Sequence, residues 1–368
     1  MSKASTPFRA QRMIIVAAML TLSACAAESY HTLAPLGATP LTANPLTGNS
    51  APVHDPSIIR QDATYYSFSS DPVNPRPYQY LPIRCSTDAA SWKPCGQVFT
   101  ALPAWVTAAV PGVSTLWAPD ISYFGGLYHL YFAASSPGSQ SSVIGLETNI
   151  TLDPSDPRYL WVDQGAVVTS HPGDDFNAID PTILIDTSQR ILLAHGSYWG
   201  AIKQSEIDPD SGILLASSPT RYELAVRPGV TDDPIAGPSP IQHGGFFYLF
   251  LFVEHCCEKN RSQHEYKQSV GRSSSPNGPF IDATGDALTD GEGGILSEDS
   301  GSRKAPRGGR ILFESSASWN APGGGTAYSG PDSGETVLVF HALDLSNHAT
   351  PTLWIKNITW QNGWPSLN

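Results

Sequence analysis

Charged side chains are scarce in this chain, since Asp, Glu, Lys and Arg together make up 15% of its 368 residues. Basic residues are the rarer kind, with 21 Lys and Arg against 33 Asp and Glu, and the formal net charge is −12. Binding to nucleic acid relies on clustered Lys and Arg that contact phosphates, and the sequence holds no such cluster. A nucleic-acid partner is therefore not expected, whereas a neutral ligand such as a sugar meets no electrostatic objection.

Motifs for two large groups of enzymes are also lacking. No Gly-x-Ser-x-Gly elbow occurs, so a Ser-His-Asp hydrolase has no anchor in this sequence. No glycine-rich loop follows a strand pattern and opens a helix, because Gly323-Gly324-Gly325 stands in a loop-like stretch. A nucleotide cofactor is therefore not expected.

Long apolar runs are absent apart from residues 13–24, which are too few to span a bilayer comfortably. The basic residues Lys3, Arg9 and Arg12 precede this run, and together they predict a signal peptide over residues 1–25. Its end, Leu22-Ser23-Ala24-Cys25, suits signal peptidase and also resembles a bacterial lipobox that would acylate Cys25. Both readings predict export, either as a secreted protein or as a cell-surface or periplasmic lipoprotein, with membrane contact only through a lipid at Cys25.

Cysteine is sparse, with five residues in the chain. Cys85 and Cys95 stand close together in a turn-rich stretch, where a disulfide or a buried pair of free thiols is expected. The adjacent residues Cys256 and Cys257 either form a disulfide that closes a small ring or remain two free thiols. They are not a zinc signature, because no second cysteine pair stands at ligand spacing.

Glycine and proline are abundant, at 32 residues each, and indicate many short strands joined by turns. Residues 26–52 show no periodicity and are expected to form an unstructured lead-in. Five later segments repeat a short polar or Asp-Pro start, a turn and an aromatic or β-branched strand: 55–69, 119–132, 180–195, 237–251 and 336–341. Four of the starts are about sixty residues apart, which is the size of a propeller blade. An all-β, five-bladed β-propeller over residues 53–368 is therefore predicted in preference to a β-sandwich.

Three motifs on these segments resemble glycoside hydrolase family 43, most closely its endo-1,5-α-L-arabinanases. They are His54-Asp55-Pro56-Ser57, residues 116–121 (Leu-Trp-Ala-Pro-Asp-Ile) and residues 177–181 (Asn-Ala-Ile-Asp-Pro). The resemblance spans roughly residues 52–366 and implies a five-bladed inverting hydrolase with three carboxyl groups in its central channel. The implied substrate is α-1,5-linked L-arabinan or its oligosaccharides; another pentose polymer such as arabinoxylan is an alternative.

The resemblance also implies roles for two aspartates. Asp55 matches the general base that activates water, and Asp180 matches the aspartate that tunes the pKa of the acid. Inverting hydrolases separate base and acid by roughly 6.5–9.5 Å to admit that water, which carboxyls on different blades facing one channel could achieve. The alternative for either residue is a purely structural role as a turn cap, since Asp-Pro commonly starts turns. Asp120 follows its proline and is expected to be structural.

The third carboxyl is missing at its expected place. The stretch 233–238 reads Asp-Pro-Ile-Ala-Gly-Pro, and Ala236 occupies the position of the general-acid Glu. Asp232, Asp233 and Glu254 are nearby substitutes, although none has the right offset. The alternative is a catalytically weakened relative that binds arabinan.

The fifth blade lacks the His that the resemblance places near a channel metal, since residues 321–327 read Ala-Pro-Gly-Gly-Gly-Thr-Ala. The resemblance thus implies a channel Ca²⁺ ion as cofactor, but the expected His is absent and no residue is assigned to the ion. Calcium prefers six to eight oxygen ligands, and no loop shows that spacing. His341 is expected to pack behind the site.

Sugar binding needs stacking surfaces and hydrogen-bonding groups. The candidates in the motifs are Trp117, Asn177, Ser197 and Trp199, with Phe176 as a weaker one. The alternative for each Trp is packing between blades, and Asn177 could instead bond to a turn backbone.

Overall fold

The computed structural model describes residues 1, 39–40, 44–71, 79–218, 220–227, 232–254, 266–283, 285–289, 310–330 and 336–367. The predicted signal peptide with Cys25 and the pair Cys256-Cys257 lie outside the described residues. Among the described residues, no helix is both long and apolar enough to cross a membrane.

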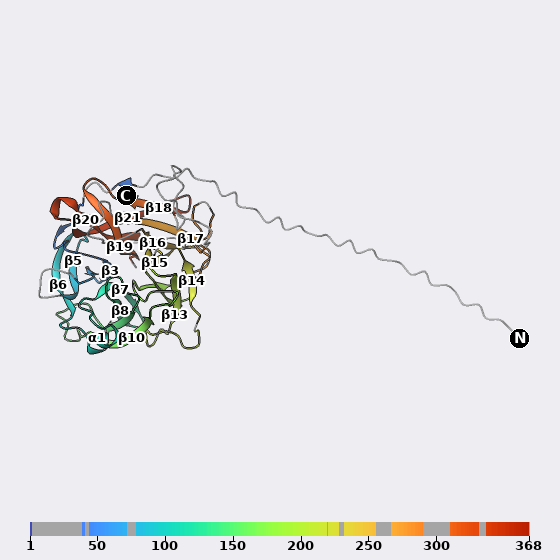
Figure 1. Cartoon of the computed structure of the whole chain (residues 1–368), viewed down its shortest axis with the longest axis horizontal. Coiled ribbons are helices and arrows are strands. Elements are labelled where there is room, and N and C mark those ends of the chain that lie inside the picture. The colour runs from blue at the N-terminus through green and yellow to red at the C-terminus, as the bar shows by residue number, and fades with distance from the viewer. Residues whose placement is uncertain are drawn as a thin grey trace. The chain divides into compact units, whose positions relative to one another are not determined.

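The described residues form five sheets, which Figure 1 shows packed around a common centre. Blade 1 consists of β3 (Ser57–Gln61), β4 (Thr64–Phe68), β5 (Tyr80–Ser86) and β6 (Ser91–Phe99). Blade 2 consists of β7 (Trp117–Phe124), β8 (Leu127–Ala134), β9 (Ser142–Asn149) and β10 (Val162–Ser170). Blade 3 consists of β11 (Thr182–Ile185), β12 (Ile191–His195), β13 (Ile202–Ile207) and β14 (Tyr222–Ala225). Blade 4 consists of β15 (Ile235–His243), β16 (Phe246–Val253), β17 (Lys267–Ser273) and β18 (Arg310–Glu314). Blade 5 consists of β19 (Trp319–Ser329), β20 (Thr336–Asp344), β21 (Thr350–Gln361) and β22 (Trp364–Leu367).

Each blade is an antiparallel meander that begins with its inner strand. In blade 1, for example, Ser57 of β3 pairs with Phe68 of β4 across a tight turn. The repeated segments of the sequence therefore correspond to first and second strands of successive blades. The prediction of an all-β, five-bladed propeller is confirmed. The single α-helix of the described part, α1 (Ala104–Ala109), joins blades 1 and 2.

Apolar side chains between neighbouring blades form the core. Phe68 of blade 1 packs in one buried cluster with Leu130 and Phe132 of blade 2. Similar clusters lie between blades 2 and 3, 3 and 4, and 4 and 5. Strands buried on both faces explain why the second strands read as nearly continuous apolar runs, such as Phe246–Val253.

The interface between blades 5 and 1 closes the ring and involves the segment that precedes blade 1. Leu353 of β21 donates a backbone hydrogen bond to Ser50 (2.8 Å), and Val53 donates one to Pro351 (2.8 Å). The amide of Asn44 donates to the carbonyl of Leu353 at 2.7 Å. The lead-in therefore fastens the first blade to the last.

Our expectation of an unstructured lead-in over residues 26–52 is wrong for its described part. Strand β1 (Thr39–Pro40) pairs in parallel with β18, and β2 (Thr47–Gly48) pairs in parallel with β6. Outer blade edges offer unpaired backbone groups that any sequence can satisfy, so these strands need no hydrophobic alternation. That is why composition alone missed them.

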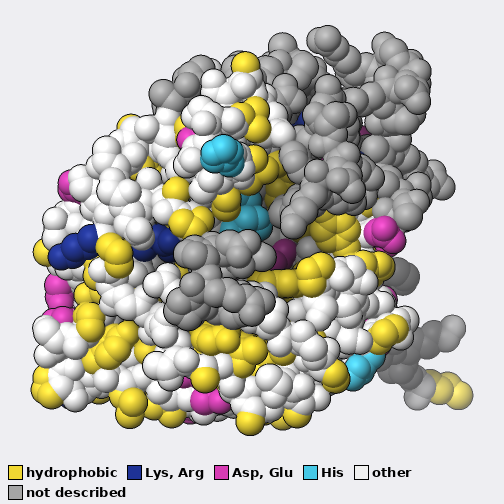
Figure 2. Space-filling view, turned by 60° about the vertical axis from the view of Figure 1, so that its left-hand side comes forward, with side chains coloured by type: hydrophobic (Ala, Val, Ile, Leu, Met, Phe, Trp, Pro, Cys, Tyr) yellow, Lys and Arg dark blue, Asp and Glu magenta, His cyan; other side chains and the backbone are white. Residues whose placement is uncertain are grey.

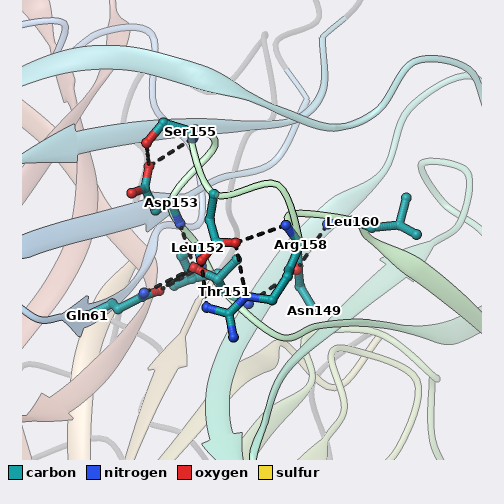
Figure 3. Close-up of polar contacts among 9 residues, drawn as sticks. Gln61, Asn149, Thr151, Leu152, Asp153, Ser155, Arg158 and Leu160 are labelled. Atoms are coloured by element: carbon teal, nitrogen blue, oxygen red, sulfur yellow. Dashed lines mark hydrogen bonds and ion pairs between the residues drawn. The ribbon is translucent and has the colours of Figure 1, made fainter.

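At the opposite end of β3 from Asp55, side-chain bonds tie blade 1 to the loop between β9 and β10 (Figure 3). Gln61 donates to the hydroxyl of Thr151 (3.1 Å) and accepts from the backbone of Leu152 (2.6 Å). The side-chain oxygen of Asn149 accepts from the backbone of Leu160 at 3.2 Å. This loop holds its shape through its own polar groups.

Two sequence expectations concern residues outside the channel. Cys85 and Cys95 form a disulfide between β5 and β6, with Cα atoms 5.7 Å apart. Asp120 accepts hydrogen bonds from the hydroxyl of Ser57 (3.3 Å) and the backbone of Ile183 (2.8 Å). It thereby links the inner strands of blades 1, 2 and 3, in agreement with the structural role expected for it.

Candidate active site

The five inner strands present equivalent residues to the centre of the propeller. Asp55, Ala118, Asp180, Gly237 and Gly324 have φ values of 48°, 43°, 54°, 57° and 46°, all in the left-handed region. Such a conformation is unusual for residues other than glycine and is typical of functional positions. These five residues line one cavity of about 280 Å³, a volume that includes space open to solvent. The residues that follow four of them in sequence also line it: Pro56, Pro119, Pro181 and Gly325. Figure 2 shows a recessed face in which histidine and acidic side chains lie among hydrophobic ones.

Asp55 is held by a dense set of hydrogen bonds. Its Oδ2 accepts from the hydroxyl of Ser70 at 2.6 Å and lies 2.7 Å from Nδ1 of His54. The Ser70 hydroxyl in turn accepts from the backbone of Ala118 at 2.8 Å. The backbone N–H of Asp55 donates to Nδ1 of His341 at 3.2 Å. The carboxylate is therefore fixed in place by groups from blades 1, 2 and 5.

The electrostatic surroundings keep Asp55 ionised. Burial opposes ionisation, but the charge of His54 and its hydrogen bond outweigh burial and hold the pKa of Asp55 well below its ordinary value. For His54, burial is likewise outweighed by the charge of Asp55, and the pKa of the imidazole is raised. The ring of His341 stacks on His54 with centroids 3.7 Å apart. Burial and the charge of His54 lower the pKa of His341 to about 3, so this second ring stays neutral.

Asp180 has the opposite character. Burial, and next the negative charge of Asp55, raise the pKa of Asp180 to about 7. A hydrogen bond with the hydroxyl of Ser197 and one from the backbone of Gly237 (3.2 Å) oppose that rise without cancelling it. The cavity thus contains one carboxylate and one carboxylic acid that titrates near neutrality.

Ala236, at the position expected for the general acid, is buried in an apolar cluster. Its side chain lies with Phe252, Tyr266 and Ala321, and 1% of the residue is exposed. The ring of Tyr266 stacks on Phe252 with centroids 5.3 Å apart. Position 236 therefore has no carboxyl group and is surrounded by apolar side chains.

The three substitutes considered from the sequence do not line the cavity. Glu254 forms an ion pair with the buried guanidinium of Arg227, which also donates to the carbonyl of Pro234 at 3.0 Å. Asp233 is partly exposed and has a raised pKa, owing to burial and to the charge of Asp232. An acid function for these residues is therefore not supported by their positions.

The four predicted binding residues differ in their exposure. Asn177 is completely buried, and its amide accepts from the hydroxyl of Ser142 (2.7 Å) and donates to the carbonyl of Ser197 (3.0 Å). Its side chain positions the segment that brings Ser197 to Asp180. Trp117 and Trp199 are both partly exposed, which leaves their stacking on sugars a prediction.

Three nearby residues can be tested for calcium binding. Ligand atoms of His54, Asp55 and His341 lie within 4.8 Å of one another. However, Nδ1 of His54 already bonds to the carboxylate of Asp55, and Nδ1 of His341 accepts from the backbone of Asp55. Two imidazoles with one carboxylate also lack the many oxygens that calcium prefers. A Cβ atom added at Gly324 would collide with the carboxylate of Asp55, so the space for a side chain there is taken. The residues present do not fit a calcium ion.

Sequence reasoning missed Ser70 and Tyr266 and gave His54 no role. Ser70 follows an ordinary apolar strand, and only the fold brings its hydroxyl to Asp55. The position of Tyr266 depends on Gly323, where any Cβ would collide with the tyrosine ring. The contact between Gly323 and Tyr266 could not be recognised from the sequence, whereas the adjacent His54 and Asp55 were a usable signal.

The sequence profile of the glycosyl hydrolases of family 43 matches residues 43–365. The chain belongs to this family. It is therefore a glycoside hydrolase, and the resemblance seen in the motifs is confirmed.

Relatives agree over nearly the whole length. The chain is 31% identical to "Extracellular endo-alpha-(1->5)-L-arabinanase 1" of Bacillus subtilis, covering 85% of this chain and 87% of that one. It is 32% identical to "Extracellular exo-alpha-(1->5)-L-arabinofuranosidase ArbA" of Cellvibrio japonicus, covering 86% of each. A solved structure of Cellvibrio cellulosa alpha-L-arabinanase complexed with arabinohexaose superposes with a TM-score of 0.75 at 31% identity, covering 86% of this chain and 95% of that one.

Proposed function

We propose that this protein hydrolyses α-1,5-linked L-arabinan or its oligosaccharides with inversion, using Asp55 as the general base. The observation that carries the proposal is the pair of carboxyl groups with opposite pKa shifts in one cavity. Asp55 is ionised and can accept a proton from water, while Asp180 keeps a proton up to about neutral pH. In the role carried over from the family resemblance, Asp180 tunes the pKa of the acid and orients the site.

The substrate class is supported by the relatives. Two of them carry names of enzymes acting on α-(1→5)-L-arabinan linkages, and a structural neighbour was solved with arabinohexaose. Both relatives are named extracellular, which supports export of this chain by the signal peptide predicted over residues 1–25. Lipid attachment at Cys25 is a variant of this proposal.

Release of reducing sugar from debranched arabinan by the mature chain tests the proposal. We expect the wild type to release arabino-oligosaccharides or arabinose, and Asp55→Asn to remove that activity. Absence of turnover on arabinan and on arabinoxylan would contradict the proposed hydrolysis.

A second candidate function rests on one observation, the alanine at position 236. Without a proton donor the protein would bind arabinan and release products poorly. Calorimetric titration with arabinohexaose separates the candidates, since a binder shows heat of binding with no reducing sugar. The variant Ala236→Glu would then gain turnover.

A further inference from the structure

Cleavage of an alkyl glycoside needs a proton on the departing oxygen, because an alkoxide is a poor leaving group. Of the residues that line the cavity in the described part of the chain, only Asp55 and Asp180 carry a titratable group. Asp55 is the ionised partner of His54 and cannot donate. Asp180 is therefore the remaining candidate donor among these lining residues.

The position of Asp180 places it at the blade that lacks the acid. Its Oδ2 accepts from the backbone N–H of Gly237 at 3.2 Å, and Gly237 directly follows Ala236. Ser197, which hydrogen-bonds to Asp180, forms an isolated β-bridge with Ala236. The carboxyl of Asp180 thus lies between blades 3 and 4, beside the backbone from which the missing side chain would project.

Three titratable groups face Asp180 from the surrounding elements. Asp55 and His54 belong to the entry of blade 1, and Tyr266 immediately precedes β17. Burial, and next the negative charge of Asp55, favour the protonated acid, while the charge of His54 is the smallest influence. Burial raises the pKa of the Tyr266 phenol well above its ordinary value and keeps the phenol protonated. Tyr266 is therefore not expected to give up a proton in place of Asp180.

We propose that Asp180 is itself the proton donor of this hydrolase, in place of the residue missing at position 236; this inference rests on the proposed hydrolysis of arabinan. The carboxyl O–H of Asp180 gives its proton to the glycosidic oxygen, which keeps the electron pair of the breaking bond to the anomeric carbon. Water attacks that carbon from the opposite face and loses its proton to the carboxylate of Asp55. Afterwards Asp55 returns its proton to solvent and Asp180 takes one up.

The test compares two substrates that differ in leaving group. Unsubstituted α-1,5-arabinotetraose needs protonation of an alkoxide, whereas a 2,4-dinitrophenyl α-1,5-arabinotrioside releases a phenolate without help. We expect Asp180→Asn to lose about 10²–10⁴-fold in kcat on the tetraose and far less on the aryl trioside. The alkaline limb of the wild-type pH profile, near pH 7, should disappear in the variant with the aryl substrate.

Matched variants separate proton donation from structure. Asp120→Asn removes another buried carboxyl whose pKa is raised to about 7 by burial, but one that does not line the cavity. We expect it to affect both substrates equally. The double variant Ala236→Glu/Asp180→Asn should recover part of the loss on the tetraose, and thermal unfolding of each variant verifies folding.

The outcomes are distinguishable. If Asp180→Asn loses the same factor on both substrates, Asp180 only positions the sugar and the inference is wrong, while the proposed function stands. If the wild type cleaves the aryl trioside but not arabinotetraose or arabinan, the chain has no proton donor, and both the inference and the proposed hydrolysis of arabinan are wrong. If the wild type cleaves neither substrate, the proposed function fails and the donor role fails with it.

Discussion

Asp55 and Asp180 occupy the same place in two different blades, yet they have opposite chemistry. Both have a left-handed backbone, with φ of 48° and 54°, and both precede a proline at the entry to an inner strand. The pKa of Asp55 lies well below its ordinary value, while that of Asp180 rises to about 7. The backbone therefore sets where the carboxyl groups lie, and it does not set their charge.

Their partners make the difference. Asp55 faces the imidazole of His54, a cation in its protonated form, and accepts a short hydrogen bond from Ser70. Asp180 has neutral donors from Ser197 and Gly237 and faces the negative charge of Asp55. A repeated scaffold can thus supply a base and an acid by changing one neighbour in each blade.

The most damaging change to this arrangement is Asp55→Asn. Loss of the group that activates water should lower kcat about 10²–10⁴-fold on arabinan and equally on an aryl arabinoside, since both need the nucleophile. Steady-state kinetics on the two substrates measures this. Calorimetric titration with arabinohexaose provides the control, because binding should persist. Undiminished turnover would remove Asp55 from the mechanism.

Removing the cation should make Asp55 behave more like Asp180. In His54→Ala the pKa of Asp55 should rise by about one to three units, because an opposite charge beside a carboxylate lowers its pKa by that amount. Activity would then be lost at a higher pH on the acid side of the kcat/KM profile. His129→Ala, a buried histidine stacked on Phe124 in blade 2, is the matched control. An unchanged acid limb in His54→Ala would show that another group holds Asp55 ionised.

The sequence alone predicted the five blades and the positions of Asp55 and Asp180, but not the difference in protonation between them. The alternation of turns and apolar strands gave the five-bladed architecture, and the Asp-Pro motifs located Asp55 and Asp180 at the channel. The opposite protonation of the two carboxyls was not predictable, because it depends on contacts such as that of Ser70 with Asp55, which are distant along the chain.

The edge strands of the lead-in and the apolar cluster behind Ala236 could not be predicted from the sequence either. Edge strands such as β2 form through backbone groups, which leave no side-chain pattern in a sequence. The apolar cluster behind Ala236 forms because Gly323 leaves room for the ring of Tyr266, a residue of the preceding blade. Composition cannot show that two such residues meet.

The two carboxyls should also sense each other directly. In Asp55→Asn the negative charge facing Asp180 is gone, so the pKa of Asp180 should fall below about 7. It should remain above the ordinary value because burial, the larger cause, is unchanged. Carboxyl ¹³C NMR titration, with Asp180→Asn for assignment, measures the shift. A pKa that does not move would mean that burial alone determines the protonation of Asp180.

The smallest expected effect concerns stability, and here the two residues should differ in sign. The folded-state pKa of Asp180, about 7, exceeds the ordinary value of 3.8, so the folded protein loses stability as pH rises between these values. Asparagine cannot ionise, so Asp180→Asn should raise Tm relative to the wild type above pH 7 and change it little at pH 4. Asp55 has a depressed pKa, which stabilises the fold above pH 3.8 and is lost as pH falls, so Asp55→Asn should lower Tm at pH 7. Thermal unfolding of both variants across pH 4–8 decides the matter: Tm changes of equal sign at pH 7 would contradict the electrostatic contrast between blades 1 and 3.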